Sequence, residues 1–373
     1  MGDLGDAFVN PFDWSGVYRG RHVLVTGHTG FKGGWLSLWL AALGARVTGF
    51  SLPAPTTPSL FEAARLGDRV DHVEGDVRDR DALGRTVARV TPDLVFHLAA
   101  QPIVRASYGD PIATFATNVM GTANVLDAVR VAGREVAVIV ITSDKCYENR
   151  EWPHAYRETD RLGGRDPYSA SKAAAEIVVS SFRQSFFPPE RMAAHGVAVA
   201  TTRAGNVIGG GDWASDRIVP DCLRALRGGE SIAVRRPGAV RPWQHVLEPL
   251  AGYLMLGARL ASADPAERAR FADAWNFAPD VGDSRTVREL VCEIVAAYGG
   301  GAWHEASDGG PHEAGMLRLA NDKARALLGW KPLWGFPRAV AATVDWYRAF
   351  DGGGSAADLC DRQIAEYLEM ATV

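Results

Sequence analysis

The feature that most constrains the fold lies near the start of the chain, where an apolar run meets a turn of regularly spaced glycines. Residues 21–26 have the continuous apolar character of a short buried strand, and residues 33–43 have the wide apolar face of a helix. Between them, Gly27, Gly30 and Gly33 recur at every third position. A strand that runs through such a turn directly into a helix predicts the first unit of a parallel sheet covered by helices.

The same alternation of strand and helix continues along the chain. Further strands are expected over residues 45–50, 70–76, 93–98, 136–141 and 197–202, with helices over 81–90, 118–132 and 168–186. This order predicts right-handed crossovers and an α/β fold with a Rossmann-type, doubly wound parallel sheet. After Asn206 the chain becomes rich in glycine, proline, arginine and tryptophan, which predicts a smaller, mixed α/β substrate lobe towards the C-terminus.

These changes of pattern divide the chain into two lobes and a tail. Residues 1–205 are expected to form the Rossmann domain, with 240–262 packing back on it. The second lobe is expected to comprise residues 206–239 and 263–350, and 351–373 to form a C-terminal tail that opens on a flexible glycine-rich linker.

Composition limits the partners and the compartment. Forty Lys+Arg against 44 Asp+Glu leave a formal charge of −4, without the basic excess of a nucleic-acid-binding protein. The four cysteines are widely spaced, so neither a zinc site nor a disulfide framework is indicated. The N-terminus does not resemble a signal peptide, and the apolar residues 35–43 are too few for a membrane helix. We expect a cytoplasmic protein without metal, nucleic-acid or membrane partners.

The glycine turn has the chemistry of a dinucleotide site. Its first glycine permits a tight turn, its second lets backbone N–H groups approach a pyrophosphate, and its third lets the helix pack closely. The alternative is a turn that serves packing alone. The second strand ends at Ser51, where a carboxylate would bind the adenosine ribose, and Lys32 adds a positive charge nearby. These residues therefore leave NAD and NADP both open.

A candidate catalytic set follows the strand 136–141. Ser143, Asp144 and Lys145 stand where the carboxyl end of that strand should border the ligand crevice. Tyr168 and Lys172 are one helical turn apart, which predicts an ammonium group beside a phenol. The lysine and the positive charge of a bound cofactor ring should together lower the phenol pKa. Taken alone, such a pair is more often a surface pair, but the glycine turn and the serine favour a catalytic interpretation.

On these motifs, from about Arg21 to about Tyr347, the chain resembles the extended short-chain dehydrogenase/reductases that act on nucleotide sugars. The closest resemblance, to the 4,6-dehydratases among them, lies in the runs 26–33 (TGHTGFKG), 142–147 (TSDKCY), 203–213 (RAGNVIGGGDW) and 241–246 (RPWQHV). The resemblance implies NAD as the cofactor and a nucleotide sugar as the substrate. It also implies a homodimer or homotetramer, joined through the helices that follow Tyr108 and Tyr168.

The resemblance further implies a reaction. C4 of the hexose is oxidised by hydride transfer to NAD, water is eliminated across C5 and C6, and the hydride returns to C6. Tyr168 would take the C4 hydroxyl proton, Ser143 would hydrogen-bond that oxygen, and Lys172 would bind the nicotinamide ribose. Asp144 is the candidate acid for the C6 hydroxyl, which requires a raised pKa. Lys145 either abstracts the C5 proton as a neutral base or stays charged and stabilises the enolate.

The remaining implied positions fall into two groups. The cofactor positions are Gly27, Thr29, Gly30, Phe31, Lys32, Gly33, Ser51, Asp76, Val77, Leu98, Ala99, Ala100, Asn118, Tyr168 and Lys172. The substrate positions are Gln101, Arg105, Asn206, Arg217, Arg235, Arg241, Trp243 and His245. Arginine suits a diphosphate because its guanidinium group can donate two parallel hydrogen bonds to it.

Other functions share part of this pattern. A nucleotide-sugar 4-epimerase or a simple reductase needs the Tyr168–Lys172 pair, but no acid and base at C5 and C6. The resemblance favours CDP-D-glucose as the substrate of a dehydratase, but a dehydratase of a different nucleotide sugar is also open, because no residue type here recognises cytosine uniquely. A redox-sensing binding protein would keep the glycine turn but usually lacks the tyrosine and lysine.

Overall fold

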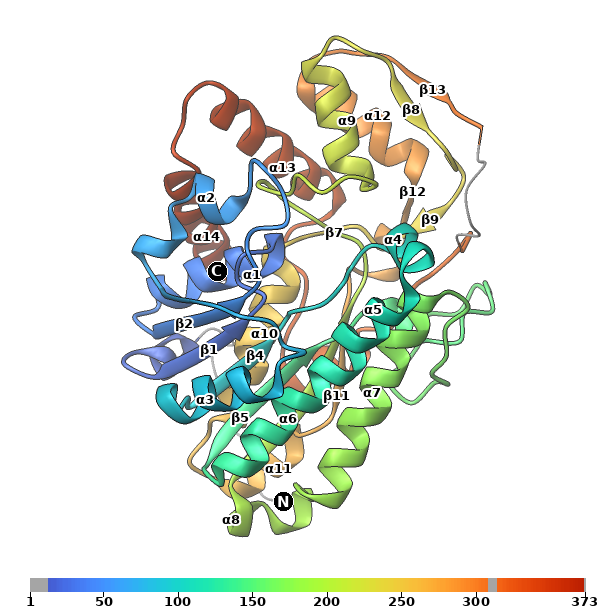
Figure 1. The fold of residues 1–373 in the computed structure, drawn as a ribbon. Helices are drawn as coiled ribbons and strands as arrows, with labels where there is room; N and C mark the ends of the chain where they lie inside the picture. The colour runs from blue at the N-terminus through green and yellow to red at the C-terminus, as the bar shows by residue number, and fades with distance from the viewer. Residues whose placement is uncertain (1–12, 308–313, 372–373) are drawn as a thin grey trace, which may run out of the picture.

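A seven-stranded parallel sheet forms the centre of the molecule in the computed structural model, which describes residues 13–307 and 314–371 (Figure 1). The strand order is β11-β6-β5-β4-β1-β2-β3, and every pairing within the sheet is parallel. The strands are β1 (His22–Thr26), β2 (Arg46–Ser51), β3 (Asp71–Glu74), β4 (Leu94–His97), β5 (Val136–Ile141), β6 (Val197–Ala204) and β11 (Ala274–Phe277). The predicted doubly wound α/β fold is confirmed, and all six expected strands are present.

Helices cover both faces of this sheet because the strand side chains alternate between two apolar clusters. Val23 and Val25 of β1 belong to one cluster and Leu24 to the other, as the two-residue period of a strand requires. The first cluster includes residues of α1 (Phe31–Ala42), α10 (Leu247–Leu260), α13 (Phe336–Asp351) and α14 (Ala356–Ala371). The second includes residues of α3 (Arg80–Val90), α6 (Gly121–Ala132) and α7 (Pro167–Ser185). The shorter helices are α2 (Leu60–Ala63), α4 (Val104–Gly109), α5 (Pro111–Phe115), α8 (Met192–His195) and α11 (Pro265–Phe271).

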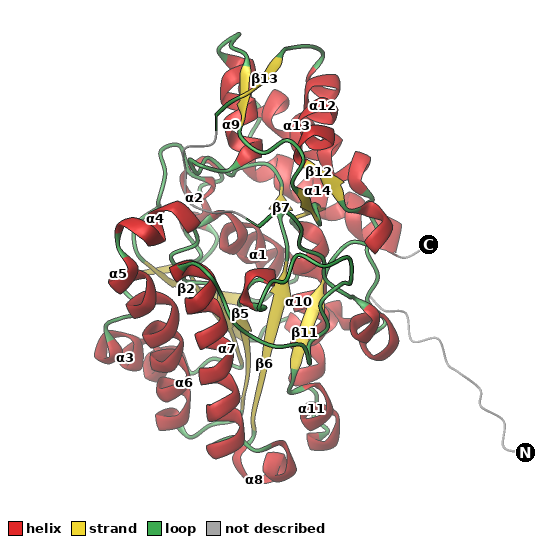
Figure 2. Cartoon of the chain, turned by 90° about the vertical axis from the view of Figure 1, so that its right-hand side faces the viewer, coloured by secondary structure: helices red, strands yellow, loops and turns green. Residues whose placement is uncertain are grey.

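A smaller lobe stands above the carboxyl ends of the strands (Figure 2). It contains α9 (Ile218–Arg227), α12 (Val287–Tyr298), the parallel pair β8 (Ile232–Val234) and β13 (Trp303–Glu305), and the antiparallel pair β9 (Val240–Arg241) and β12 (Arg285–Thr286). A further parallel pair, β7 (Val207–Ile208) with β10 (Gln244–His245), connects the central sheet to the smaller lobe. The mixed α/β character expected for this part is therefore present.

The lobe boundaries differ from the division expected from sequence. β11 lies within 263–350, the range expected in the second lobe, yet it pairs with β6 at the edge of the central sheet. The glycines after α13 close that helix rather than form a flexible linker, since the Gly354 N–H donates to the Ala349 carbonyl at 2.9 Å. The expected tail is largely the helix α14, whose Tyr367 is fully buried and stacks edge-on against Trp39 of α1.

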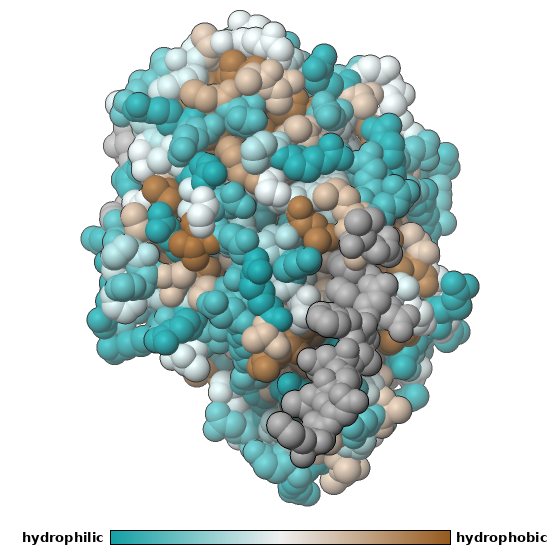
Figure 3. Space-filling view, turned by 180° about the vertical axis from the view of Figure 1, so that it is seen from behind, coloured by the Kyte–Doolittle hydropathy of each residue, from teal (hydrophilic) through white to brown (hydrophobic). Residues whose placement is uncertain are grey.

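The surface seen from behind is mostly hydrophilic, with apolar side chains in small separate patches (Figure 3). Among the described residues, no helix has the length and apolar character needed to cross a bilayer.

Candidate active site

A cavity of about 1470 Å³ lies between the two lobes at the carboxyl ends of the parallel strands. Residues at the ends of six strands line one side of it: Gly27, Ser51, Gly75, Leu98, Thr142 and Ala204. Residues of the smaller lobe line the other side, among them Val219, Arg235, Trp243 and Val287. This is the position at which doubly wound sheets bind their ligands, because the strand ends and the helix N-termini face the same crevice.

The glycine turn is shaped by close contacts that exclude side chains. Gly27 has φ +79°, and a Cβ there would lie 2.7 Å from the Ala99 nitrogen. A Cβ on Gly33 would lie 2.2 Å from the carbonyl oxygen of Gly27. Gly30 precedes α1 without a side-chain cap, which leaves the first N–H groups of the helix available for an anion.

The far end of the turn meets Ser51 at the end of β2. The hydroxyls of Thr29 and Ser51 are 2.8 Å apart, and Thr29 also donates to the Leu52 carbonyl at 3.0 Å. Asp76, which follows β3, lines the same part of the cavity, and a hydrogen bond from Arg78 lowers the pKa of its carboxyl. The end of β2 carries no carboxylate that could bind an adenosine ribose. Asp76, which follows the neighbouring strand β3, supplies a carboxylate in the same part of the cavity.

The serine, aspartate and lysine after β5 meet the tyrosine of α7. Ser143 donates to Asp144 Oδ1 at 2.9 Å and accepts from the Lys145 backbone N–H at 3.2 Å. The Tyr168 hydroxyl lies close enough to Ser143 for the serine to lower its pKa, and Lys145 Nζ lies 6.0 Å from the centre of the Tyr168 ring. The four side chains therefore form one cluster at the end of the cavity.

The residues of the chain alone do not lower the Tyr168 pKa, and the expected lowering also depends on the positive charge of a bound cofactor ring. Burial raises that pKa to about 12, against the opposing effects of the hydrogen bond with Ser143 and the charge of Arg217. Lys172 Nζ instead donates to the Ile141 carbonyl at 3.2 Å. Burial lowers the pKa of Lys172 to about 8, and the nearby Glu176 opposes this shift. For the Tyr168 pKa, the loss of hydration on burial therefore outweighs the effect of the lysine that the helical spacing places nearby.

Asp144 has the property that an acid role requires. Burial raises the pKa of its carboxyl, although Lys145, the hydrogen bond from Ser143 and Arg241 all oppose the shift. Its Oδ2 is buried and has no hydrogen-bond partner within the described ranges. A buried carboxyl with one unpaired oxygen is poised to hold a proton.

Basic side chains reach the cavity from the smaller lobe and from α4. Arg217 pairs with Asp212 at 2.8 Å, while Arg105 and Arg235 both approach Asp216, at 3.9 and 3.4 Å. Arg241 and Asn206 also line the cavity. Lys32 is half-buried near this group, and desolvation, with the charges of Arg217 and Lys172, lowers its pKa to about 7.

Three expected site residues lie outside the cavity lining. His245 is fully buried with its ring between those of Trp35 and Trp334, so it does not border a nucleotide. The Asn118 side chain is occupied by the Gln101 backbone and by Ser171, with its Oδ1 accepting the Gln101 N–H at 2.8 Å. The Gln101 side chain bonds Thr114 and the Ile103 N–H, which fixes its own loop. All the other expected site residues line the cavity.

Sequence reasoning missed two groups of residues. The apolar second-lobe residues Val219, Ile232 and Val287 line the cavity, but no local pattern marks them. The ion pair of Glu176 and Arg203 lies behind the catalytic cluster. A charged residue within a buried strand or on the inner face of a helix is a signal that could have identified this pair, since such charges require partners.

The fold and the site together define a class of protein. A Rossmann-type sheet whose glycine turn, strand-end serine and Tyr168–Lys172 helix all open on one cavity has the organisation of an extended short-chain dehydrogenase/reductase.

Comparison with known proteins gives the family within that class. The family model described as GDP-mannose 4,6 dehydratase matches residues 24–251, more than half of the chain. The chain is 48% identical to a CDP-glucose 4,6-dehydratase from Salmonella typhimurium, over 95% of this chain and 98% of that protein. The chain therefore belongs to the GDP-mannose 4,6-dehydratase family.

Solved structures agree with the fold. A dTDP-glucose 4,6-dehydratase from Streptomyces venezuelae, solved with NAD bound, has a TM-score of 0.74 at 24% identity and covers 90% of this chain and 99% of that chain. A UDP-glucose 4-epimerase from Thermus thermophilus in complex with NAD has a TM-score of 0.73 at 26% identity, covering 88% and 99%. Dehydratases and epimerases thus share this architecture, so the reaction must be argued from the site.

Proposed function

We propose that this protein is a hydro-lyase that converts CDP-D-glucose to CDP-4-keto-6-deoxy-D-glucose with NAD as its cofactor. The observation that carries the proposal is the cluster of Asp144 and Lys145 beside Ser143 and Tyr168, because an epimerase needs no acid and base at C5 and C6. The 48% identity to a CDP-glucose 4,6-dehydratase supports both the reaction and the nucleotide.

The described residues fit a nicotinamide dinucleotide. The uncapped start of α1 and the crowded glycine turn suit a pyrophosphate, while Ser51 and Asp76 lie where the adenosine ribose would bind. When bound, the dinucleotide supplies a hydride acceptor at C4 and the hydride that returns to C6. Lys172 would hold its nicotinamide ribose from α7. The relatives solved with NAD support this cofactor over NADP.

The first chemical task of the chain is to remove the C4 hydroxyl proton. Tyr168 takes this proton while Ser143 hydrogen-bonds the same oxygen. Since burial raises the Tyr168 pKa to about 12, the phenol needs additional positive charge to act near neutral pH, and a bound nicotinamide cation adds it.

The second task is the elimination. The C4 ketone acidifies the C5 proton and makes the C6 hydroxyl a β leaving group. Asp144, whose pKa is raised by burial, would give its proton to the departing C6 hydroxyl. Lys145, from the same turn, takes the C5 proton when neutral or stabilises the enolate when charged.

Anionic substrate would be held from the smaller lobe. Arg217, Arg235 and Arg241 line the cavity together with Asn206, and these side chains can bind the diphosphate. Trp243 borders the same space. The nucleotide base of the substrate would lie against the apolar residues of the smaller lobe that face the cavity.

One assay tests the substrate and the reaction together. The purified protein is incubated with CDP-, dTDP-, GDP- and UDP-glucose, and the alkaline ultraviolet absorbance of a 4-keto-6-deoxy sugar is followed. We expect product from CDP-glucose. Product from another nucleotide alone would overturn the substrate assignment, and an epimer in its place would overturn the reaction.

We also propose a homodimer through α5, α6 and α7. Large apolar side chains are exposed on this side of the chain, including Ile112 at 76%, Met120 at 56% and Ile177 at 59%. Ile177→Glu should lower the mass measured by light scattering to that of one chain, whereas Leu327→Glu, at an exposed position elsewhere, should not. A wild-type protein with the mass of one chain would contradict this proposal.

We further propose that the protein acts in the cytoplasm. All four cysteines are free thiols in the structure, three of them buried, which fits a reducing compartment. Labelling of intact and lysed cells with a membrane-impermeant protein reagent tests this; labelling of the protein in intact cells would contradict it.

A further inference from the structure

A buried ion pair lies directly behind the catalytic cluster. Glu176 of α7 and Arg203 of β6 have side chains only 3% and 4% exposed. Arg203 Nε and Nη2 donate to the two carboxylate oxygens of Glu176 at 2.9 and 2.8 Å. Neither residue lines the cavity, so the pair contacts neither substrate nor cofactor space. Any role in the reaction must therefore be exerted through neighbouring side chains.

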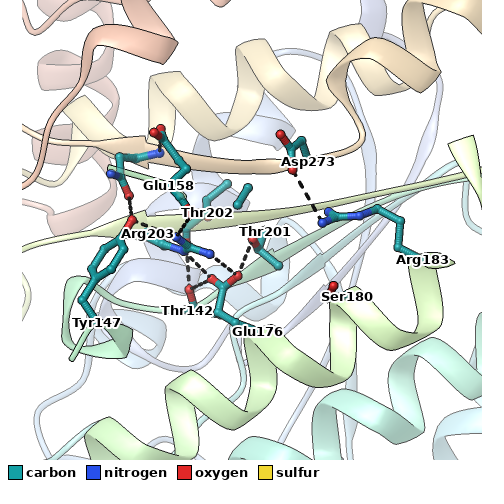
Figure 4. A network of polar contacts seen from close by, with 12 residues as sticks. Thr142, Tyr147, Glu158, Glu176, Ser180, Arg183, Thr201, Thr202, Arg203 and Asp273 are labelled. Atoms are coloured by element: carbon teal, nitrogen blue, oxygen red, sulfur yellow. Dashed lines mark hydrogen bonds and ion pairs between the residues drawn. The ribbon is translucent and has the colours of Figure 1, made fainter. Parts of the chain in front are cut away.

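The pair joins the strand ends that carry the site (Figure 4). Thr142, the residue before Ser143, donates to Glu176 Oε1 at 2.5 Å, and Thr201 of β6 donates to Oε2 at 2.7 Å. The Thr142 backbone N–H also donates to the Thr202 carbonyl at 2.8 Å. The start of the Ser143–Lys145 turn is thus fixed against both α7 and β6.

The network continues to the edge of the sheet. Arg203 Nη1 donates to the Tyr147 hydroxyl at 2.8 Å, and that hydroxyl donates to Asn276 Oδ1 of β11 at 2.8 Å. Tyr147 follows the η4 turn (Asp144–Cys146), so both ends of this catalytic turn are held by the same pair.

Glu176 is also one helical turn after Lys172. Its charge is the first influence that opposes the effect of burial on the Lys172 pKa. Other titratable groups near Lys172 include Tyr168, one helical turn before it on α7, and Cys146 of η4, His97 of β4 and Lys32 of α1. His97 is neutral near pH 7 because burial lowers its pKa to about 3, and Cys146 is neutral because burial raises its pKa. The Glu176 carboxylate is therefore the anion that favours a charged Lys172.

We propose that Glu176, paired with Arg203, is the positioning residue of this active site: it fixes the Ser143–Lys145 turn against α7 and keeps an anion beside Lys172. Two hydroxyls and a guanidinium group satisfy the carboxylate on all sides. This arrangement makes the position and the charge of Glu176 independent of what enters the cavity. The kinetic part of the inference rests on the proposed function, whereas the charge state of Lys172 does not.

The experiment compares three variants with the wild-type protein. Glu176→Gln keeps the shape and removes the charge. The double variant Glu176→Gln/Arg203→Met also removes the guanidinium that the single variant leaves buried without its anion. Asp273→Asn is the matched control, because Asp273 approaches Arg183 at the other end of α7, at 3.6 Å. For each protein, the pH dependence of Lys172 acetylation by acetic anhydride is followed by peptide mass spectrometry, alongside the melting temperature and the kinetics.

In both glutamine variants, the pKa of Lys172 should be lower by roughly one unit than in the wild type, as expected for the loss of an adjacent negative charge. Their kcat should fall by about 10²-fold, and the alkaline limb of kcat/KM should move to lower pH. The double variant should regain melting temperature without regaining kcat, and the control should behave as the wild type.

Two results would overturn the inference. One is an unchanged Lys172 titration in both glutamine variants, and the other is a kcat in the double variant that recovers together with its melting temperature. If wild-type protein makes no 4-keto-6-deoxy product from any nucleotide glucose, the proposed function fails, and the Lys172 titration still decides whether Glu176 sets the charge at this site.

Discussion

Glu248 allows a quantitative test of how burial acts in this fold. Its side chain is fully buried at the start of α10, where it accepts the backbone N–H groups of Leu333 and Trp334 and the Tyr367 hydroxyl. Burial raises its pKa from 4.5 to about 7, against those three hydrogen bonds. The carboxyl therefore binds its proton more tightly in the folded state than in the unfolded state.

The sign of the pH dependence follows from that shift. The stabilisation from the bound proton is fully present below pH 4.5 and is lost as the pH rises through 7. The free energy of unfolding therefore falls towards alkaline pH. With about 1.4 kcal/mol for each unit of pKa, the loss at alkaline pH amounts to about 3 kcal/mol. Glu248→Gln remains neutral at every pH and can still accept the two N–H groups, so it should remove this loss.

Urea unfolding followed by tryptophan fluorescence measures the effect. Between pH 5 and pH 8, the free energy of unfolding of Glu248→Gln relative to wild type should rise by about 2–3 kcal/mol. Glu267→Gln, which removes the carboxylate of the surface pair with Arg259, is the control. If the difference between Glu248→Gln and wild type is the same at both pH values, the reasoning from burial is refuted.

Three further predictions concern the site. Gly33→Ala should lower the melting temperature and abolish dinucleotide binding measured by calorimetry, because its Cβ would lie 2.2 Å from the Gly27 oxygen; normal binding would contradict the packing argument. Asp144→Asn should reduce turnover by about 10²- to 10⁴-fold and accumulate reduced nicotinamide, seen by its near-ultraviolet absorbance, since C4 oxidation needs no acid at C6. Unchanged turnover would remove Asp144 from the elimination. Lys145→Met should lose deuterium exchange at C5 in heavy water, and undiminished exchange would show that Lys145 is not the base.

Much of the fold could be predicted because its signals are local. The strand, glycine turn and helix at the start of the chain are consecutive, and the six expected strands are short apolar runs separated by helices. The spacing of Tyr168 and Lys172 likewise depends only on helix geometry. β11 escaped prediction because its four residues follow a stretch without clear alternation, and its partner β6 is distant in sequence.

The site divides in the same way. Sequence alone determined which chemical groups are present and which strand ends carry them, since a side chain and its place in a motif are properties of the chain. Only the tertiary structure decided their states and partners. It turned His245 away from the cavity, raised the Tyr168 pKa, and placed Glu176 against Arg203 behind the catalytic turn. Burial and ion pairing depend on residues that are far apart in sequence, and folding alone brings those residues together.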